Sequence, residues 1–216
     1  DMNIVRYTAA FLAALMLMAP AGHATEGEVP NETAETVVAE QNWQMLLVHP
    51  WNELPEEFTV ELKELSNGLE VDARIYDDLT AMLEDCRKAG LNLLVCSAYR
   101  TLETQTRLYN NKIARLRAAG YSKEGAAKEA GRWVAVPGTS EHQTGLALDM
   151  VSMNYQLLDE KQADTPEQQW LMAHSWEYGF ILRYPEEKQS VTGIGYEPWH
   201  YRYVGRKAAV AMHDSG

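Results

Sequence analysis

The chain has 216 residues, of which 46% are hydrophobic, and its formal net charge at pH 7 is −12. Such an acidic chain argues against nucleic acid or an anionic membrane surface as a partner, because like charges repel. The length suits one domain with a sizeable core, and no internal repeat indicates a second domain.

The first 24 residues are typical of a secretory signal peptide. Arg6 precedes an apolar run over residues 7–18, and small residues follow up to Ala24, after which we expect cleavage. The run is shorter than the about 20 apolar residues that cross a bilayer, so a permanent anchor is the less favoured alternative. Residues 25–40 carry five acidic and no basic side chains, which predicts a solvated acidic linker. We therefore expect an exported protein, in the periplasm or on the cell-wall side of the membrane, with its folded domain over residues 41–216.

A first helix is predicted over residues 72–89, because Asp72 can cap its start and Gly90 ends it. Its apolar stripe consists of Ile75, Leu79, Met82 and Cys86. The strand that follows runs about 20 Å back from the turn and ends at Cys96. Cys86 lies only one helical turn from Gly90, so the two sulfurs are too far apart for a disulfide. We expect two buried thiols.

The strand over residues 91–96 leads into the segment Ser-Ala-Tyr-Arg, which ends at Arg100. A second helix is predicted over residues 101–120, with one face formed by Leu102, Gln105, Tyr109, Ile113 and Leu116. Gln105 is the polar member of this stripe. It either bridges backbone groups at the helix start or borders a cleft beside Arg100.

A second strand is predicted over residues 146–151, where Asp149 and Ala147 share one face of the sheet and the intervening leucines point to the other. Thr165 and Gln168 can form a capping box, which predicts a third helix ending near Gly179. A short strand follows it. Helices that flank a few short strands, with hairpin-like connections late in the chain, predict an α+β fold: a single domain with a small antiparallel sheet flanked by helices.

Two segments together carry the side chains of a metal-activated hydrolase. The first contains His142 and Asp149, and the second contains Glu197 and His200. Two imidazoles and a carboxylate can hold zinc and leave a fourth position for water, which is the catalytic pattern. Glu197 is the residue type that takes a proton from such a water. Pro198 disfavours helix at Glu197, so this is not the helical arrangement of other zinc peptidases.

The neighbouring residues have simpler readings beside the functional ones. His174 is the strongest competing ligand, but a lone histidine on a helix face is more often a hydrogen-bonded core residue. Trp199 either packs to fix its strand or forms a pocket wall, and Ser140 either caps a turn or contacts substrate. Arg202 and Arg206 are expected to form a solvated edge without a function.

Three segments, residues 97–100, 140–149 and 197–200, resemble the VanY-type D-alanyl-D-alanine carboxypeptidases. These enzymes belong to a wider group of zinc peptidases that includes the VanX-type dipeptidases. The similarity extends over about residues 43–205. One departure is Ala98, where glycine is common in the family.

The resemblance implies a role for seven side chains around one zinc ion. It implies that the ligands are His142, Asp149 and His200, that the catalytic residues are Glu197 and Arg100, and that Gln105 and Ser140 contact substrate. In such an enzyme the zinc activates a water, the glutamate takes its proton and the arginine stabilises the oxyanion. The implied reaction removes the terminal D-alanine from the stem pentapeptide precursors of peptidoglycan.

Other functions stay open at this point. A dipeptidase acting on free D-alanyl-D-alanine and an endopeptidase acting elsewhere in the stem peptide use the same apparatus, although the export signal disfavours the dipeptidase. A non-catalytic, zinc-stabilised module that binds cell wall would not require Glu197 or Arg100. The predicted partner is a peptidoglycan precursor peptide ending in D-Ala-D-Ala; we expect no nucleic acid and no stable protein partner.

Overall fold

The computed structural model describes residues 43–215, so the predicted signal peptide and the whole predicted linker lie outside the described residues. The strands are β1 (Leu62–Glu64), β2 (Glu70–Asp72), β3 (Leu93–Ser97), β4 (Ala147–Ser152), β5 (Phe180–Leu182) and β6 (His200–Tyr203). The helices are α2 (Tyr76–Lys88), α3 (Leu102–Ala118), α4 (Lys123–Gly131), α5 (Pro166–His174), α6 (Gln189–Thr192) and α7 (Arg206–Ser215). Within the described part of the chain, no helix is both long and apolar enough to cross a membrane.

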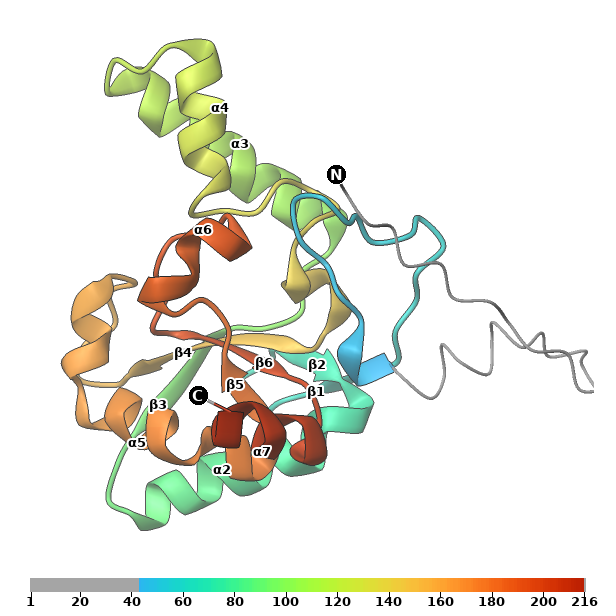
Figure 1. Cartoon of the computed structure of the whole chain (residues 1–216), viewed down its shortest axis with the longest axis vertical. Helices are drawn as coiled ribbons and strands as arrows, with labels where there is room; N and C mark the ends of the chain where they lie inside the picture. The colour runs from blue at the N-terminus through green and yellow to red at the C-terminus, as the bar shows by residue number, and fades with distance from the viewer. Residues whose placement is uncertain (1–42, 216) are drawn as a thin grey trace, which may run out of the picture.

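The central element is a four-stranded sheet in the order β3-β4-β6-β5, in which every neighbouring pair is antiparallel. Strands β1 and β2 form a separate antiparallel pair. Figure 1 shows α2, α5 and α7 together on one side of the sheet, while α3 and α4 project away from the body. This arrangement confirms the predicted α+β fold with a small antiparallel sheet.

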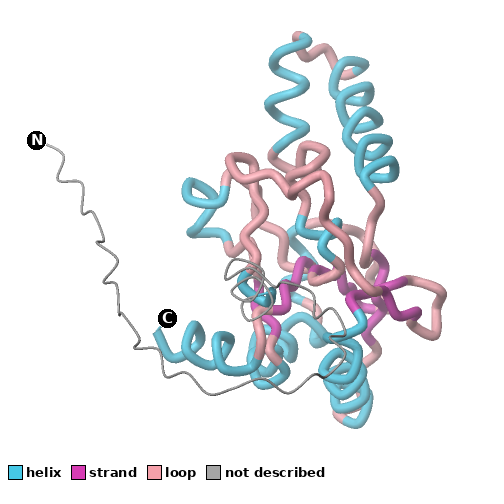
Figure 2. Tube along the Cα trace, turned by 90° about the vertical axis from the view of Figure 1, so that its right-hand side faces the viewer, coloured by secondary structure: helices cyan, strands magenta, loops and turns pink. Residues whose placement is uncertain are grey.

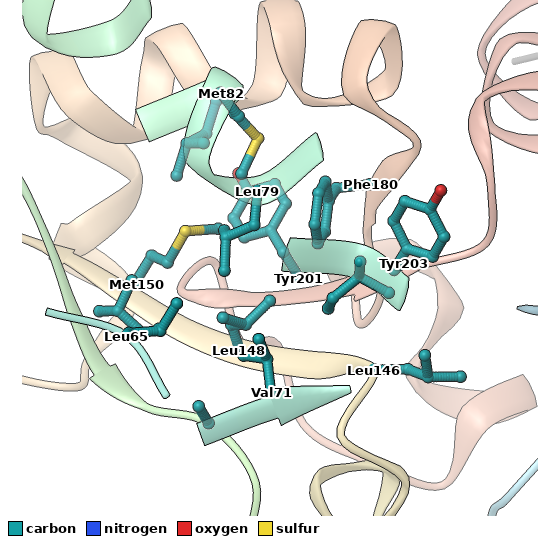
Figure 3. Close-up of a cluster of buried hydrophobic side chains, with 14 residues drawn as sticks. Leu65, Val71, Leu79, Met82, Leu146, Leu148, Met150, Phe180, Tyr201 and Tyr203 are labelled. Atoms are coloured by element: carbon teal, nitrogen blue, oxygen red, sulfur yellow. The ribbon is translucent and has the colours of Figure 1, made fainter. Parts of the chain in front are cut away.

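The hydrophobic core lies between the sheet and α2 (Figure 3). The sheet contributes Leu148, Met150, Tyr201 and other side chains, and α2 contributes Leu79 and Met82. A fully buried side chain of this size stabilises the fold by about 1.5–3 kcal/mol. Because side chains alternate along a strand, the residues between these core positions point to the opposite face of the sheet.

The predicted helix starts are confirmed. The carboxylate of Asp72 accepts from the backbone N–H of Arg74, which opens a 3₁₀ turn (Ala73–Ile75) that continues into α2. The hydroxyl of Thr165 accepts from the N–H of Gln168 and caps α5. The α-helical part of the third helix is shorter than expected, because α5 ends at His174. A 3₁₀ turn (Ser175–Tyr178) then continues to the predicted end near Gly179.

Helix α4 is not predicted by the sequence reading. Ser122 caps it, and its buried side chains are the alanines Ala126 and Ala130, so it has little apolar periodicity to detect. It pairs with α3 as a projecting helical hairpin (Figure 2), with the Tyr109 hydroxyl donating to the Ala127 carbonyl. Leu102, expected on the apolar stripe of α3, is exposed at the first position of the helix.

Both cysteines are free, and Cys86 is buried as expected. The prediction that Cys96 is buried is wrong, because this residue is exposed. It lies on β3 at the edge of the sheet, at a register irregularity between Val95 and Ser97. Val95 points into the core, so the next residue along the strand points away from it.

Candidate metal centre

Three predicted ligands meet on the sheet face opposite the core. Asp149 of β4 and His200 of β6 are directly paired across the antiparallel ladder, so their side chains lie side by side. His142 comes from a 3₁₀ turn (Glu141–Thr144) that ends at Gly145 with a φ of 74°. A Cβ at Gly145 would lie 2.7 Å from the backbone nitrogen of Asp72, so only glycine allows the chain to turn here.

The distances between these side chains fit a tetrahedrally coordinated metal ion. The Oδ1 atom of Asp149 lies 3.3 Å from Nε2 of His142 and 3.3 Å from Nδ1 of His200. Two N or O ligands bound to tetrahedral zinc at about 2.0–2.1 Å are themselves about 3.3–3.4 Å apart. This buried Oδ1 has no hydrogen-bond partner among the described residues, although such atoms are normally satisfied. These three side chains are therefore suited to bind a metal cation.

The far side of each imidazole is held by a hydrogen-bond acceptor. Nδ1 of His142 lies 2.7 Å from the carbonyl oxygen of Ala98 and donates to it, which leaves Nε2 as the free ligand atom. Nε2 of His200 lies 3.4 Å from Oε2 of Glu141, which leaves Nδ1 facing the metal position. Such acceptors fix the tautomer and orientation of metal-binding histidines.

Glu141 is the centre of a buried ion-pair network that the sequence reading missed. Its Oε1 accepts from Nε of Arg183 at 2.8 Å and from Nη1 of Arg202 at 3.0 Å. Burial alone would raise the pKa of Glu141, but Arg202, the hydrogen bond with His200 and Arg183 together hold it far below its usual range. Glu141 is therefore ionised in the folded protein.

The prediction that Arg202 is a solvated residue is wrong, since only 3% of it is exposed. It stands two positions after His200 on β6, and the alternation of the strand therefore turns it to the same buried face. That spacing is the signal by which the sequence could have revealed it. Arg206, by contrast, is largely exposed and pairs with Asp78.

Glu197 lies beside the ligands with the environment of a proton-transfer group. Its Oε2 is 3.6 Å from Nδ1 of His200, and a turn closed by the hydrogen bond from the His200 N–H to the Glu197 carbonyl leads into β6. Burial raises the pKa of Glu197 to about 8. A carboxyl group whose pKa is near the working pH can both take and return a proton.

The ligands themselves have shifted titrations. Burial, with the charge of Arg100, lowers the pKa of His142. Burial also opposes protonation of His200, but the neighbouring carboxylates of Asp149 and Glu141 outweigh that effect and raise its pKa to about 9. Against the effect of burial, the two histidines and Arg100 hold the pKa of Asp149 well below its usual range. The site is thus a set of strongly interacting charges.

Arg100 is held in the site by three hydrogen bonds. Its Nη2 donates to Oδ2 of Asp149 at 2.7 Å, its Nε to the Ser97 hydroxyl at 2.9 Å, and its Nη1 to Oε1 of Gln105 at 3.4 Å. Gln105 is fully buried and also donates to the Ala135 carbonyl at 2.7 Å. These contacts make Gln105 a support for the guanidinium, and its contact with substrate stays a prediction.

A cavity of about 410 Å³ opens over the metal position, a size within the usual range for ligand sites. Arg100, Ser140, Glu197 and Trp199 line it together with the three ligands. Trp199 is both buried and part of the wall, so its two readings are compatible. His174 lies outside this group and pairs with Glu177 through Nδ1 at 2.7 Å.

Comparisons with known proteins agree with this geometry. A family model described as VanY, D-alanyl-D-alanine carboxypeptidase, matches residues 68–206, a segment that contains all seven predicted site residues. A D-alanyl-D-alanine carboxypeptidase of Enterococcus faecalis is 40% identical over 205 residues, covering 91% of this chain and 75% of the relative. The solved structure of VanYB in complex with D-alanine-D-alanine has 41% identity and a TM-score of 0.74, covering 81% of this chain and 93% of the other. A vancomycin-resistance D,D-pentapeptidase VanY variant, solved in complex with Zn(II), also has 41% identity, with a TM-score of 0.73 and coverage of 80% and 94%.

Proposed function

Because the chain belongs to the VanY family of D-alanyl-D-alanine carboxypeptidases, we propose that it is a zinc-dependent enzyme that removes the terminal D-alanine from peptidoglycan stem pentapeptide precursors. The proposed zinc ligands are His142, Asp149 and His200. The proposed catalytic residues are Glu197 and Arg100.

One observation carries the proposal. The unpartnered, buried Oδ1 of Asp149 stands 3.3 Å from a ring nitrogen of each histidine, a separation that tetrahedral zinc would set. The Zn(II) bound to the related VanY variant and the D-alanine-D-alanine bound to VanYB support the choice of metal and substrate. Zinc bound here would act as a Lewis acid that lowers the pKa of a coordinated water to about 7.

The residues of the chain would then carry the proton and stabilise the charge. Glu197 takes a proton from the attacking water and returns it to the amine of the departing D-alanine, a role that its raised pKa suits. Arg100, fixed by Ser97 and Gln105, presents its guanidinium to the scissile carbonyl oxygen, where negative charge develops. Ser140, buried in the cavity wall, is proposed to contact the peptide.

We also propose that the enzyme acts outside the cytoplasmic membrane. The support is the sequence pattern of residues 1–24 as a signal peptide and residues 25–40 as an acidic linker, followed by a catalytic domain over residues 41–216. An extracytoplasmic location would bring the enzyme to its peptidoglycan precursor.

The test is chromatography of the products that the zinc-loaded protein releases from a stem pentapeptide and, separately, from free D-alanyl-D-alanine. We expect D-alanine and a tetrapeptide from the first, with little product from the dipeptide. Glu197→Ala should bind zinc with unchanged stoichiometry and lose about 10²- to 10⁴-fold in kcat, which is the usual contribution of a general acid-base group. A zinc-loaded protein inert towards every stem peptide would favour the binding module, and a fully active Glu197→Ala variant would remove the base assignment.

A further inference from the structure

The cavity extends beyond the metal to a second end formed by the projecting hairpin. Four residues on one face of α3 line this outer end, with spacings of three, one and three: Leu108, Asn111, Lys112 and Arg115. Trp133, which follows α4, forms the adjacent wall. None of these residues has a part in the proposed bond cleavage.

The cavity carries charges of both signs at its metal end, where Arg100 lies beside the carboxylates, and only basic charges at its outer end. The carboxylates that line it, Glu141, Asp149 and Glu197, all belong to the metal end, while the outer end contributes Lys112 and Arg115. Among residues 43–215, no carboxylate lies within 4.0 Å of either of these two cations. Two basic side chains left without an acidic partner in the described part of a chain of net charge −12 are available to an anionic ligand.

Trp133 is a rigid wall rather than a mobile side chain. Its Nε1 donates to Oε1 of Glu129 at 2.9 Å. A Cβ on Gly195 would lie 2.6 Å from the Trp133 ring, so the glycine is what lets the ring pack against this loop, two residues before Glu197. The N–H of Gly195 also donates to the carbonyl of Arg132 at 2.8 Å. The outer wall is thereby fixed to the segment that carries the proposed base.

The length of α3 separates the two cations from the reacting end. Gln105, which bonds to Arg100, precedes Lys112 by seven residues and Arg115 by ten, which is about 10 Å and 15 Å along a helix. One extended peptide residue spans only about 3.3–3.6 Å. A carboxylate on the departing D-alanine is therefore too close to the metal to be the main ligand of Arg115, whereas a group about three to four residues earlier in the peptide is within reach.

We propose that Lys112 and Arg115, beside Trp133, form a subsite for a carboxylate borne by the substrate peptide on the amino-terminal side of the scissile bond. This inference rests on the proposed function and narrows its substrate class to acidic peptides ending in D-Ala-D-Ala. A free dipeptide leaves the outer end of the cavity empty. The subsite thus favours a carboxypeptidase acting on the whole stem over a dipeptidase.

The experiment compares kcat/KM for three substrates on the zinc-loaded protein. The first is a stem pentapeptide whose second residue, D-glutamate, has a free α-carboxylate; the second is the same peptide with that group amidated; the third is a short acetylated peptide ending in D-Ala-D-Ala. The wild-type chain should prefer the acidic over the amidated pentapeptide by about three- to tenfold, the effect of one or two partly exposed ion pairs. The ratio should fall to about 1 in Lys112→Ala/Arg115→Ala and become smaller than 1 when both are changed to Glu.

The matched control is Arg107→Ala, since Arg107 is an exposed cation on α3 that does not line the cavity, and this variant should keep the wild-type ratio. Equal cleavage of the two pentapeptides by the wild type, or a ratio that survives in the double variant, would overturn the subsite. So would an equal loss on all three substrates, which would assign the cations to the terminal D-alanine. Cleavage of the short peptide tests the proposed function separately. If nothing is cleaved, calorimetric affinities for the acidic and amidated pentapeptides still test the subsite by the same ratio.

Discussion

The carboxylate of Glu141 should control zinc affinity without touching the metal. It accepts from Arg183 and Arg202, and its Oε2 lies 3.4 Å from the His200 nitrogen that faces away from the metal position. Removal of such a partner behind a metal-binding histidine costs about 10- to 100-fold in metal affinity. We therefore expect Glu141→Gln to weaken zinc binding by that factor, which is about 1.4–2.8 kcal/mol.

The two substitutions at this position separate orientation from charge. The amide oxygen of Glu141→Gln still accepts from Arg183 and Arg202, whereas Glu141→Ala leaves both cations without a carboxylate partner. Loss of one member of a buried ion pair costs about 3–5 kcal/mol, so the alanine variant should be much less stable than the glutamine variant when metal-free. Zinc competition with a chromophoric chelator gives the affinity, and urea denaturation gives the stability.

The control for Glu141→Gln is Glu177→Gln. Glu177 forms the same kind of pair, to His174, but both side chains are nearly half exposed, at 44% and 45%. This change should leave zinc affinity unaltered and alter stability by less than about 1 kcal/mol. Wild-type zinc affinity in a folded Glu141→Gln variant would refute the reasoning that the carboxylate orients His200.

Three further predictions follow from the same contacts. In metal-free protein, burial raises the pKa of Glu197 to about 8, and Asp149 and Glu141 raise the pKa of His200 to about 9 against the effect of burial. The folded state therefore retains protons that the unfolded chain releases. The free energy of unfolding, measured by urea denaturation, should fall from about pH 6.5 to pH 9. A rise over that range would contradict these shifts. Zinc at 1,000 times its Kd should stabilise the protein by about 4 kcal/mol, seen as a higher Tm that chelation reverses and that is absent in Asp149→Ala. Leu148→Ala should cost about 2–5 kcal/mol because the side chain is fully buried, whereas the same change at the 62% exposed Leu157 should have little effect; equal losses would contradict the described core.

Local signals in the sequence were sufficient to predict where the helices beside the sheet begin and which side chains of β4 face away from the core. Asp72 and Thr165 predict helix starts because such side chains can accept from the otherwise unpaired N–H groups of a first helical turn, and both residues act as caps in the structure. The alternation in β4 was enough to separate Asp149 from the core leucines on either side of it. Helix α4 was not predicted, because its buried side chains are all small and prediction from hydrophobic periodicity requires an apolar stripe.

The candidate ligands could be read from residue types, but their supporting contacts could not. His142 and His200 are 58 residues apart, and the hydrogen bond from His200 to Glu141 depends on how the turn before β4 folds onto β6. The same holds for the burial of Arg202, whose Nη2 donates to the carbonyls of Gln44 and Leu46 near the start of the described chain. Contacts of such long sequence separation are properties of the folded arrangement.

Three buried carboxylates near the metal position have different surroundings, and these surroundings suit them to three different roles. Glu141 accepts hydrogen bonds from two arginines, so it stays ionised and can hold a histidine ring in place. Asp149 is bonded on one oxygen by Arg100 and has its other oxygen unpartnered between two imidazoles, which suits a metal ligand. Glu197, among the described contacts, receives no hydrogen bond from an arginine, and burial raises its pKa to about 8, which suits proton transfer. Titratable groups whose surroundings separate their pKa values in this way indicate which one acts as acid or base. The assignment of Glu197 as the base therefore follows from its partners as well as from its position in the chain.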